Sequence, residues 1–593
     1  MKKEIIQLQQ RMEEHSIDYY LVPTSDYHHS EYVSDFFKCR EYLSGFTGSA
    51  GTLLVSAESA WLWTDGRYYV QAEQELTETD INLMKDGTTD VPTIAEFLKR
   101  SMKDGQVLGF DGRLFTIGFI NGLRRTLSSR KIDFRYDCDL VEEVWNERPP
   151  ISTEPIFCYP ESYAGISASE KIASYQEYLK KHHAHCQLIN GLADIAWLFN
   201  LRGHDVACTP VFLAYAYISL EEVILFVHQN ALTDDARAYL KEHKVKIRSY
   251  DTFYEFVSQL DHTRILMDYS DLNYSCYQCL SKTNTFLRAS KYTTMAKIVK
   301  NDTEIAHTRA CHIRDGIYMT KFMYWLKTTI RHRTLTELEA ASYIDELRLS
   351  DDLALDLSFD TISAYGQNAA IVHYSPSAES NAVIEAHGML LVDSGGQYMD
   401  GTTDITRTFI LGPVTDEERL CYTTTCRSML HLANAKFLTG CRGSNLDCLA
   451  REPMWELGID FRHGTGHGVG HMLSVHEGPN NFRFRVHAGN LDAVLLPSMI
   501  TTDEPGIYET GKFGIRIENE LLCQKWKRNE YGQFLSFDYL TYVPIDLDGI
   551  DPDLMNEQEK EWLNDYHKKV YEQIAPHLNE KERAWLKQYT RAI

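Results

Sequence analysis

The chain has 593 residues, more than one hydrophobic core usually supports, so roughly two to four domains are expected. Its formal net charge of -24 argues against a nucleic acid or an anionic membrane surface as partner. Thirteen scattered cysteines favour reduced thiols, and neither a secretory signal nor a membrane-spanning run is visible, so we expect a cytoplasmic protein with no membrane partner.

Residues 1–150 alternate helix and strand signals. The pattern predicts a helix over 5–14, a strand over 19–23, and a hairpin of strands 52–55 and 60–63 after a small-residue turn. A further helix is expected from about residue 69. Two consecutive prolines, Pro149 and Pro150, stop regular structure and place the first domain boundary at residue 150.

The same order of elements then recurs over residues 151–298. A helix is predicted over 167–181, a strand over 186–189, a helix over 192–199, and a hairpin over 211–227. This alternation is typical of a mixed layered α/β domain. We therefore predict an internal duplication, with the second domain ending at residue 298.

The third predicted domain covers residues 299–593. Asn301 and Glu304 have the residue types and spacing of a helix start. Strand signals and glycine turns dominate from about residue 353, and a helix is expected over 417–438. The predicted fold class of the chain is α+β.

Two aspartates of the third domain lie at the ends of predicted neighbouring strands. Asp393 ends the apolar run 389–392, and Asp404 opens a β-branched run that continues to Phe409. Ser394-Gly-Gly predicts a turn between them. Buried unpaired carboxylates are costly, so such a pair either shares a proton or binds a cation.

Histidines and glycines form the next cluster. His463 and His467 stand four positions apart in the run 463–470, which contains four glycines and so disfavours a helix. The helical zinc-protease motif is excluded for that reason, and also because its glutamate is missing. His476 follows shortly afterwards in the run Val-His-Glu-Gly-Pro.

Acidic residues near two more strand ends complete a candidate metal-ligand set. Arg516 and Glu518 are predicted on one face of a single strand. Four carboxylates and one imidazole are suited to Mn²⁺ or another hard to borderline divalent ion, and their charge suits two ions. The full set is Asp393, Asp404, His467, Glu504 and Glu518.

Residues 393–518 resemble the pita-bread metallopeptidases, the family shared by methionine aminopeptidase, prolidase and aminopeptidase P. The chain is most similar to the three-domain Xaa-Pro aminopeptidases of the cytosolic animal type. The stretches that carry this resemblance include residues 44–51, 63–67, 195–203, 373–376, 400–408 and 514–519. It implies a C-terminal pita-bread catalytic domain preceded by two smaller creatinase N-terminal-like domains.

The resemblance also implies roles for single residues. Asp393 would chelate one Mn²⁺, His467 with Glu504 would hold the second, and Asp404 with Glu518 would bridge both. Co²⁺ or Zn²⁺ are alternatives to Mn²⁺.

The substrate-binding roles implied by the resemblance involve five more residues. His373 and His476 would flank the scissile carbonyl and its developing oxyanion. His463 would shape the proline side of the pocket, and Arg516 would orient Asp393. Arg67 would reach the peptide from the first domain.

The implied reaction is hydrolysis of the N-terminal residue from peptides with proline in the second position. A metal-activated bridging water would attack the Xaa-Pro carbonyl, with Glu504 moving its proton. Relatives commonly pair through the catalytic domain, so a homodimer is expected. A prolidase that cuts Xaa-Pro dipeptides, or a non-catalytic peptide-binding module, remain alternatives; relatives of the latter kind lose metal ligands.

Overall fold

Two units make up the chain, Met1–Thr294 (unit 1) and Met295–Ile593 (unit 2), and each is described by itself. The structure is a computed structural model and describes residues 2–485 and 492–593. Within these residues no helix has both the length and the apolar character needed to cross a membrane.

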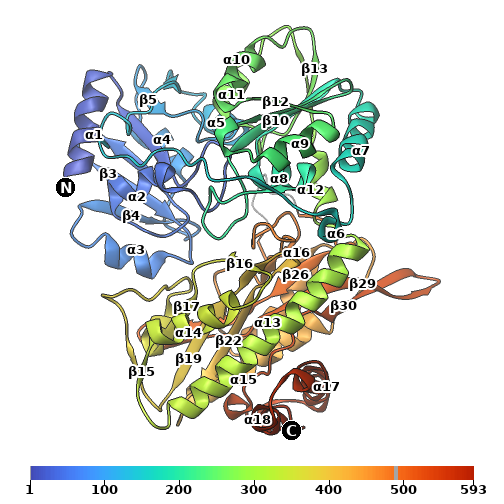
Figure 1. Cartoon of the computed structure of the whole chain (residues 1–593). Helices are drawn as coiled ribbons and strands as arrows, with labels where there is room; N and C mark the ends of the chain where they lie inside the picture. The colour runs from blue at the N-terminus through green and yellow to red at the C-terminus, as the bar shows by residue number, and fades with distance from the viewer. Residues whose placement is uncertain (1, 486–491) are drawn as a thin grey trace. The chain divides into compact units, whose positions relative to one another are not determined.

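Unit 1 contains two six-stranded sheets with the same strand arrangement (Figure 1). Their orders are β4-β3-β2-β1-β5-β6 and β12-β11-β10-β8-β13-β14. In the first sheet, β1 pairs antiparallel with β2 and parallel with β5. In the second, β8 pairs antiparallel with β10 and parallel with β13. The predicted duplication is confirmed at the level of topology.

The elements of unit 1 have the following bounds. The strands of the first sheet are β1 Tyr19–Pro23, β2 Thr52–Ser56, β3 Ala60–Thr64, β4 Ile81–Lys85, β5 Val107–Phe110 and β6 Asp133–Arg135. Those of the second are β8 Cys186–Ile189, β10 Ala214–Ser219, β11 Val223–Val227, β12 Val245–Ser249, β13 Arg264–Met267 and β14 Thr285–Arg288. The longer helices are α1 Lys3–Glu14, α3 Tyr69–Glu75, α4 Ile94–Ser101, α5 Ile117–Thr126, α7 Ala168–Lys181, α8 Leu192–Phe199 and α9 Asp234–Glu242.

Unit 2 is built from helices and several small antiparallel sheets. Its helices are α13 Asp302–Thr329, α14 Glu337–Leu349, α15 Asp416–Ala433, α16 Gly443–Trp455, α17 Glu557–Ile574 and α18 Glu580–Tyr589. The strands that matter for the site are β17 Ile362–Tyr365, β19 Met389–Ser394, β20 Gly396–Tyr398, β21 Gly401–Thr402, β22 Ile405–Ile410, β24 Gly466–His467, β25 Asn481–Phe482 and β26 Ile500–Asp503. They are followed by β27 Gly506–Glu509, β28 Phe513–Arg516, β29 Asn519–Asn529 and β30 Gly532–Tyr539.

Helix α13 covers the central strands of unit 2 (Figure 1). Its start is fixed by a capping box, in which Asn301 accepts from the backbone N–H of Glu304 and Glu304 accepts from that of Asn301. Further along, Met319 and Phe322 join a buried cluster with Phe409 of β22. The apolar face of the helix therefore packs on the sheet that carries the two aspartates.

Three local predictions were wrong. Ser394-Gly-Gly is no turn, because β19 runs through Ser394 and β20 starts at Gly396. A Cβ on Gly395 would lie 1.8 Å from the Thr403 carbonyl oxygen. Glycine is therefore required here because the backbones of residues 395 and 403 pass too close for a side chain. The helix expected to reach residue 438 ends at Ala433.

The end of that helix and the last wrong prediction both reflect strand pairing. Residues Lys436–Leu438 form β23, which pairs with β30. Arg516 and Glu518 do not share one strand: β28 ends at Arg516 after pairing with β27, and β29 begins at Asn519 and pairs with β26 and β30. Glu518 lies at the crossover between two sheets.

Candidate metal centre

The five predicted metal ligands come together in unit 2. Three groups of side chains have ligand atoms within 4.8 Å of one another. These groups are Asp393 with Asp404 and Glu518, His467 with Glu504 and Glu518, and Asp404 with His467 and His476. The groups overlap, so the five residues and His476 form one centre. Their binding of metal stays a prediction.

The two aspartates are placed by adjacent antiparallel strands. Asp393 lies near the end of β19, opposite Thr406 of β22, and Asp404 directly precedes β22. The Thr406 hydroxyl donates to Glu518 Oε2 at 2.7 Å, which brings the third carboxylate against the same strand. Residues far apart in the chain thus meet at one strand end.

The second half of the centre rests on a close approach between β24 and β26. The His467 N–H donates to Thr502 Oγ1 at 3.0 Å, and the Glu504 N–H donates to the Thr465 carbonyl oxygen at 2.8 Å. A side chain on Gly466 would meet the Thr502 carbonyl oxygen at 1.8 Å. The glycine density of this run therefore allows two backbones to touch where the ligands emerge.

The electrostatics of the centre favour a cation. Burial, and then the nearby carboxylates, raise the pKa of Asp404 and of Glu518 well above their ordinary values. Among the described residues, Asp393 Oδ1 and Glu518 Oε1 are buried without a hydrogen-bond partner. His467 Nε2 lies 3.4 Å from Asp404 Oδ2 and 3.6 Å from Glu504 Oε1. Orphaned carboxylate oxygens beside an imidazole fit hard to borderline divalent ions.

The histidines predicted to contact substrate lie on loops around the centre. The rings of His476 and His467 meet edge to face, 4.3 Å apart. The ring of His463 lies 5.3 Å from that of Tyr508. His373 lies in the loop after a short 3₁₀ helix, Gly366–Ala370. The roles of these histidines toward a substrate stay predictions.

Arg516 connects several parts of the centre. Its Nη2 donates to Asp393 Oδ2 at 2.6 Å and to the carbonyl oxygen of Val372, next to His373, at 3.3 Å. Its Nη1 donates to the Tyr508 hydroxyl at 2.7 Å. The guanidinium is 1% exposed and therefore fixes these groups relative to one another.

Two residues of the centre were missed from the sequence. Tyr508, whose pKa burial raises to about 12, lies between Arg516 and His463. Glu520 Oε1 accepts the backbone N–H of Asp404 at 2.9 Å. The signals available were their positions four residues after Glu504 and two after Glu518, but spacing alone does not distinguish such residues from ordinary strand residues.

Arg67 belongs to unit 1, away from this cluster in the chain. Its Nε and Nη2 donate to the two carboxylate oxygens of Asp65 at 2.9 and 2.8 Å, and Glu31 lies 3.6 Å from it. The guanidinium group of Arg67 is thus paired with two acidic side chains of unit 1, Asp65 and Glu31. Its predicted contact with substrate is untested.

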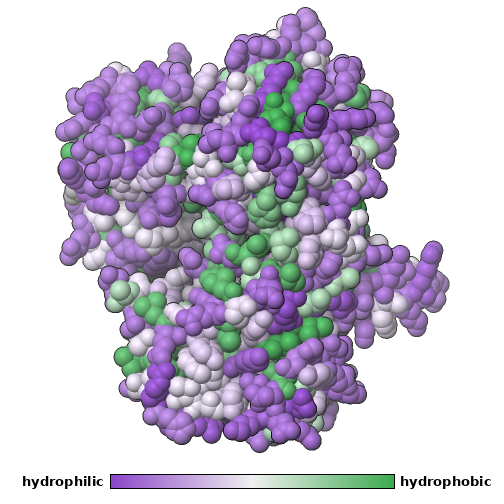
Figure 2. All heavy atoms as spheres, in the orientation of Figure 1, coloured by the Kyte–Doolittle hydropathy of each residue, from purple (hydrophilic) through white to green (hydrophobic). Residues whose placement is uncertain are grey.

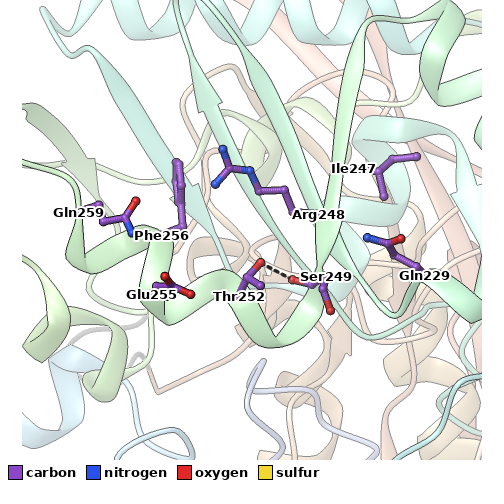
Figure 3. A pocket seen from close by; sticks show the side chains of 8 residues that line it. All are labelled: Gln229, Ile247, Arg248, Ser249, Thr252, Glu255, Phe256 and Gln259. Atoms are coloured by element: carbon purple, nitrogen blue, oxygen red, sulfur yellow. Dashed lines mark hydrogen bonds between the residues drawn. The ribbon is translucent and has the colours of Figure 1, made fainter.

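A hollow of about 450 Å³ in unit 1 is a different kind of site (Figure 3). Arg248 and Glu255 are the charged residues among its lining, and the Thr252 hydroxyl donates to the Ser249 carbonyl oxygen within one turn that borders it. The lining residues are Gln229, Ile247, Arg248, Ser249, Thr252, Glu255, Phe256 and Gln259. Since these residues include no ligand cluster, the chemistry is assigned to unit 2.

Family models match nearly the whole chain. The model of metallopeptidase family M24 matches residues 306–525, and that of the C-terminal region of peptidase M24 matches 533–593. Two models of the Creatinase/Prolidase N-terminal domain match residues 5–138 and 147–304.

Individual relatives match over similar lengths. A probable Xaa-Pro aminopeptidase P of Coprinopsis cinerea is 37% identical, over 97% of this chain and 95% of that protein. Xaa-Pro aminopeptidase 1 of Dictyostelium discoideum is 36% identical, over 97% and 93%. The crystal structure of X-prolyl aminopeptidase from Caenorhabditis elegans, described as a cytosolic enzyme with a di-nuclear active site, is 35% identical with a TM-score of 0.93, over 97% of this chain and 95% of that one.

Proposed function

The chain belongs to metallopeptidase family M24, and on that premise we propose that it is an Xaa-Pro aminopeptidase, which removes the first residue from peptides with proline in the second position. The fold predicted from the sequence, two creatinase N-terminal-type domains followed by a pita-bread catalytic domain, is confirmed. The observation that carries the activity is the meeting of four carboxylates with His467.

Two divalent ions would be held by this centre. Asp393 would bind one ion, His467 with Glu504 the other, and Asp404 with Glu518 would bridge them. Mn²⁺ suits the oxygen-rich set best, with Co²⁺ or Zn²⁺ as alternatives. When bound, the ions supply Lewis acidity toward the carbonyl and lower the pKa of a water molecule.

The protein groups complete the chemistry. The Glu504 carboxylate, 19% exposed as a side chain, is suited to accept the proton of the attacking water and to deliver it to the proline nitrogen. His476 and His373 are suited to donate to the carbonyl oxygen as its negative charge develops. Proline has no N–H and a fixed φ, so His463 and Tyr508 would hold its ring in place of strand pairing.

The first test is peptide hydrolysis by metal-stripped protein, with and without Mn²⁺. An Arg-Pro-Pro-type peptide should lose its N-terminal residue only when metal is returned, while an Xaa-Ala control stays intact. Cleavage of an Xaa-Pro dipeptide alone would make the protein a prolidase. No release with any divalent metal would refute the catalytic proposal.

A homodimer through the catalytic domain forms part of the proposal. Trp455 and Phe484 of unit 2 are 41% and 50% exposed and pack edge to face at 5.4 Å, with Leu457 nearby in the chain and 42% exposed. Figure 2 shows a mostly hydrophilic face with apolar side chains in small groups. Trp455→Glu should convert a dimer to a monomer in sedimentation velocity; a wild-type monomer would contradict the dimer.

A cytoplasmic location is also proposed. All thirteen cysteines are free thiols, as is common where glutathione keeps proteins reduced. The Caenorhabditis elegans relative is described as cytosolic. Domain boundaries near residues 150 and 298 remain a prediction within this proposal.

A further inference from the structure

The residue after His476 in the chain, Glu477, is a buried acid that pairs with two buried lysines. Glu477 Oε1 is 2.5 Å from Lys300 Nζ, and Glu477 Oε2 is 3.4 Å from Lys297 Nζ. The three side chains are 2%, 1% and 9% exposed, in the order Glu477, Lys300, Lys297. Lys300 Nζ also donates to the Lys297 carbonyl oxygen at 2.8 Å, which joins the two lysines.

The backbone of Glu477 closes a loop that begins at a metal ligand. The Glu477 N–H donates to the Gly468 carbonyl oxygen at 2.7 Å, and the Gly468 N–H donates to the Asn480 carbonyl oxygen at 2.9 Å. His467 and His476 immediately precede the two ends of this closure. Their rings are 4.3 Å apart, so the closure and the ring contact occur at the same point.

The lysines are themselves fixed to the strand that leads to Glu504. The Lys300 N–H donates to the Ser498 carbonyl oxygen at 2.9 Å, and Val299 forms a β-bridge with Met499. Strand β26 starts at the next residue, Ile500, and Glu504 follows its end. The lysines that pair with Glu477 are therefore anchored to the same segment that leads through β26 to the Glu504 carboxylate.

Stability is a poor explanation for this arrangement. Three buried charges lose their hydration, and replacing such a group by apolar side chains of similar volume is often neutral or stabilising. The cluster instead fixes the position of the Glu477 carboxylate, because each of its two oxygens faces a lysine ammonium group. His476 precedes Glu477 in the chain, so fixing Glu477 also restricts the backbone that carries the His476 ring.

We propose that Glu477 is a positioning residue for Xaa-Pro hydrolysis: held by Lys300 and Lys297, it keeps His476 against His467 and aimed at the carbonyl oxygen of the substrate. This inference rests on the proposed function. It assigns no contact with substrate to Glu477 itself, and it predicts an effect on turnover rather than on peptide binding.

The variant Glu477→Gln keeps the shape of the side chain and removes its charge. We expect kcat to fall about 10- to 100-fold with KM within about threefold of wild type, the range seen when groups that orient a catalytic residue are removed. Metal content should stay at the wild-type number of ions per chain, because the Glu477 carboxylate pairs with Lys297 and Lys300 and is not itself one of the proposed ligands. Should Glu477→Gln fail to fold, Lys297→Gln retains the shorter Lys300 pair and should show a smaller fall in kcat.

Asp546→Asn is the matched control. Asp546 also pairs with a buried lysine, Lys327, at 2.5 Å, with side chains 1% and 4% exposed, and it caps the N–H of Ile410 at the far end of β22. A lower melting temperature with unchanged kcat is expected for this variant.

The outcomes separate this inference from the proposed function. Active wild-type enzyme with unchanged kcat in both Glu477→Gln and Lys297→Gln would overturn the positioning role. So would a loss of bound metal in step with kcat, or an equal loss of kcat in Asp546→Asn. Wild-type protein that releases no residue from an Xaa-Pro peptide would instead refute the proposed function.

Discussion

Substitution of Arg516 by lysine tests whether the centre depends on a fixed guanidinium fork. The arginine donates to Asp393, to the Tyr508 hydroxyl and to the Val372 carbonyl oxygen from one buried plane. Lysine keeps the charge and can retain the shortest bond, but a single ammonium cannot meet all three acceptors. Hydrogen bonds to charged groups contribute about 1.5–3 kcal/mol each. Net of some relaxation, a loss of about 2–3 kcal/mol predicts kcat/KM lowered ~30- to 150-fold.

The assay is kcat/KM on an Arg-Pro-Pro-type peptide at saturating Mn²⁺, with melting temperature recorded alongside. Arg427→Lys is the control, since Arg427 Nε donates to both carboxylate oxygens of Glu559 at 3.0 Å between α15 and α17. That variant should keep kcat/KM within about twofold. Arg516→Lys activity within threefold of wild type, or an equal loss in Arg427→Lys, would refute the reasoning.

Three further predictions concern proton transfer, metal and pH. Glu504→Gln should lower kcat about 10²–10⁴-fold in the metal-loaded protein, as measured by single-turnover release; a smaller effect would move the proton-shuttle role elsewhere. Returning Mn²⁺ to stripped protein at about 1,000 times its Kd should stabilise the fold by about 4 kcal/mol, seen as a rise in melting temperature that metal-free buffer alone does not give. Burial, with Arg407 nearby, lowers the pKa of His567 to about 3, so below its ordinary pKa near 6.5 the unfolded chain takes up a proton that the folded chain refuses. His567 should therefore contribute a fall in stability of about 2 kcal/mol between pH 7.5 and 5, and His567→Gln should remove that contribution in urea unfolding.

The fold was predictable where local signals were strong and undisturbed. The strand Tyr19–Pro23 and the helix Leu192–Phe199 have the bounds that hydrophobic pattern and turn residues gave them. Strand β23, Lys436–Leu438, was predicted as the end of a helix. Its pairing partner, β30, lies about a hundred residues later, and this strand pairing overrides the local helical pattern.

The candidate site divides in the same way. Its ligands stand at strand ends and in glycine turns, which are visible in the sequence, and the family resemblance joined them into one set. Of the contacts that hold those ligands, the one from Arg516 to Asp393 was implied by the resemblance, and the others were not visible. Asp404 meets Glu520 across 116 residues and Lys300 meets Glu477 across 177, and no periodicity argument reaches such pairs.

Buried arginines one layer outside the ligands show how this acidic centre keeps its shape. Arg516 donates to Asp393, and Arg407, wholly buried, donates to the backbone carbonyl of Glu518. Both cations contact the ligand-bearing segments, and Arg516 bonds only one carboxylate oxygen of Asp393, which leaves Oδ1 without a hydrogen-bond partner. Burial first, and then the charges of Asp393, Glu504 and Glu520, raise the pKa of Asp404 well above its ordinary value. A divalent ion bound by these carboxylates would offset their mutual repulsion more than a monovalent ion would, so the acidic set favours a doubly charged ion.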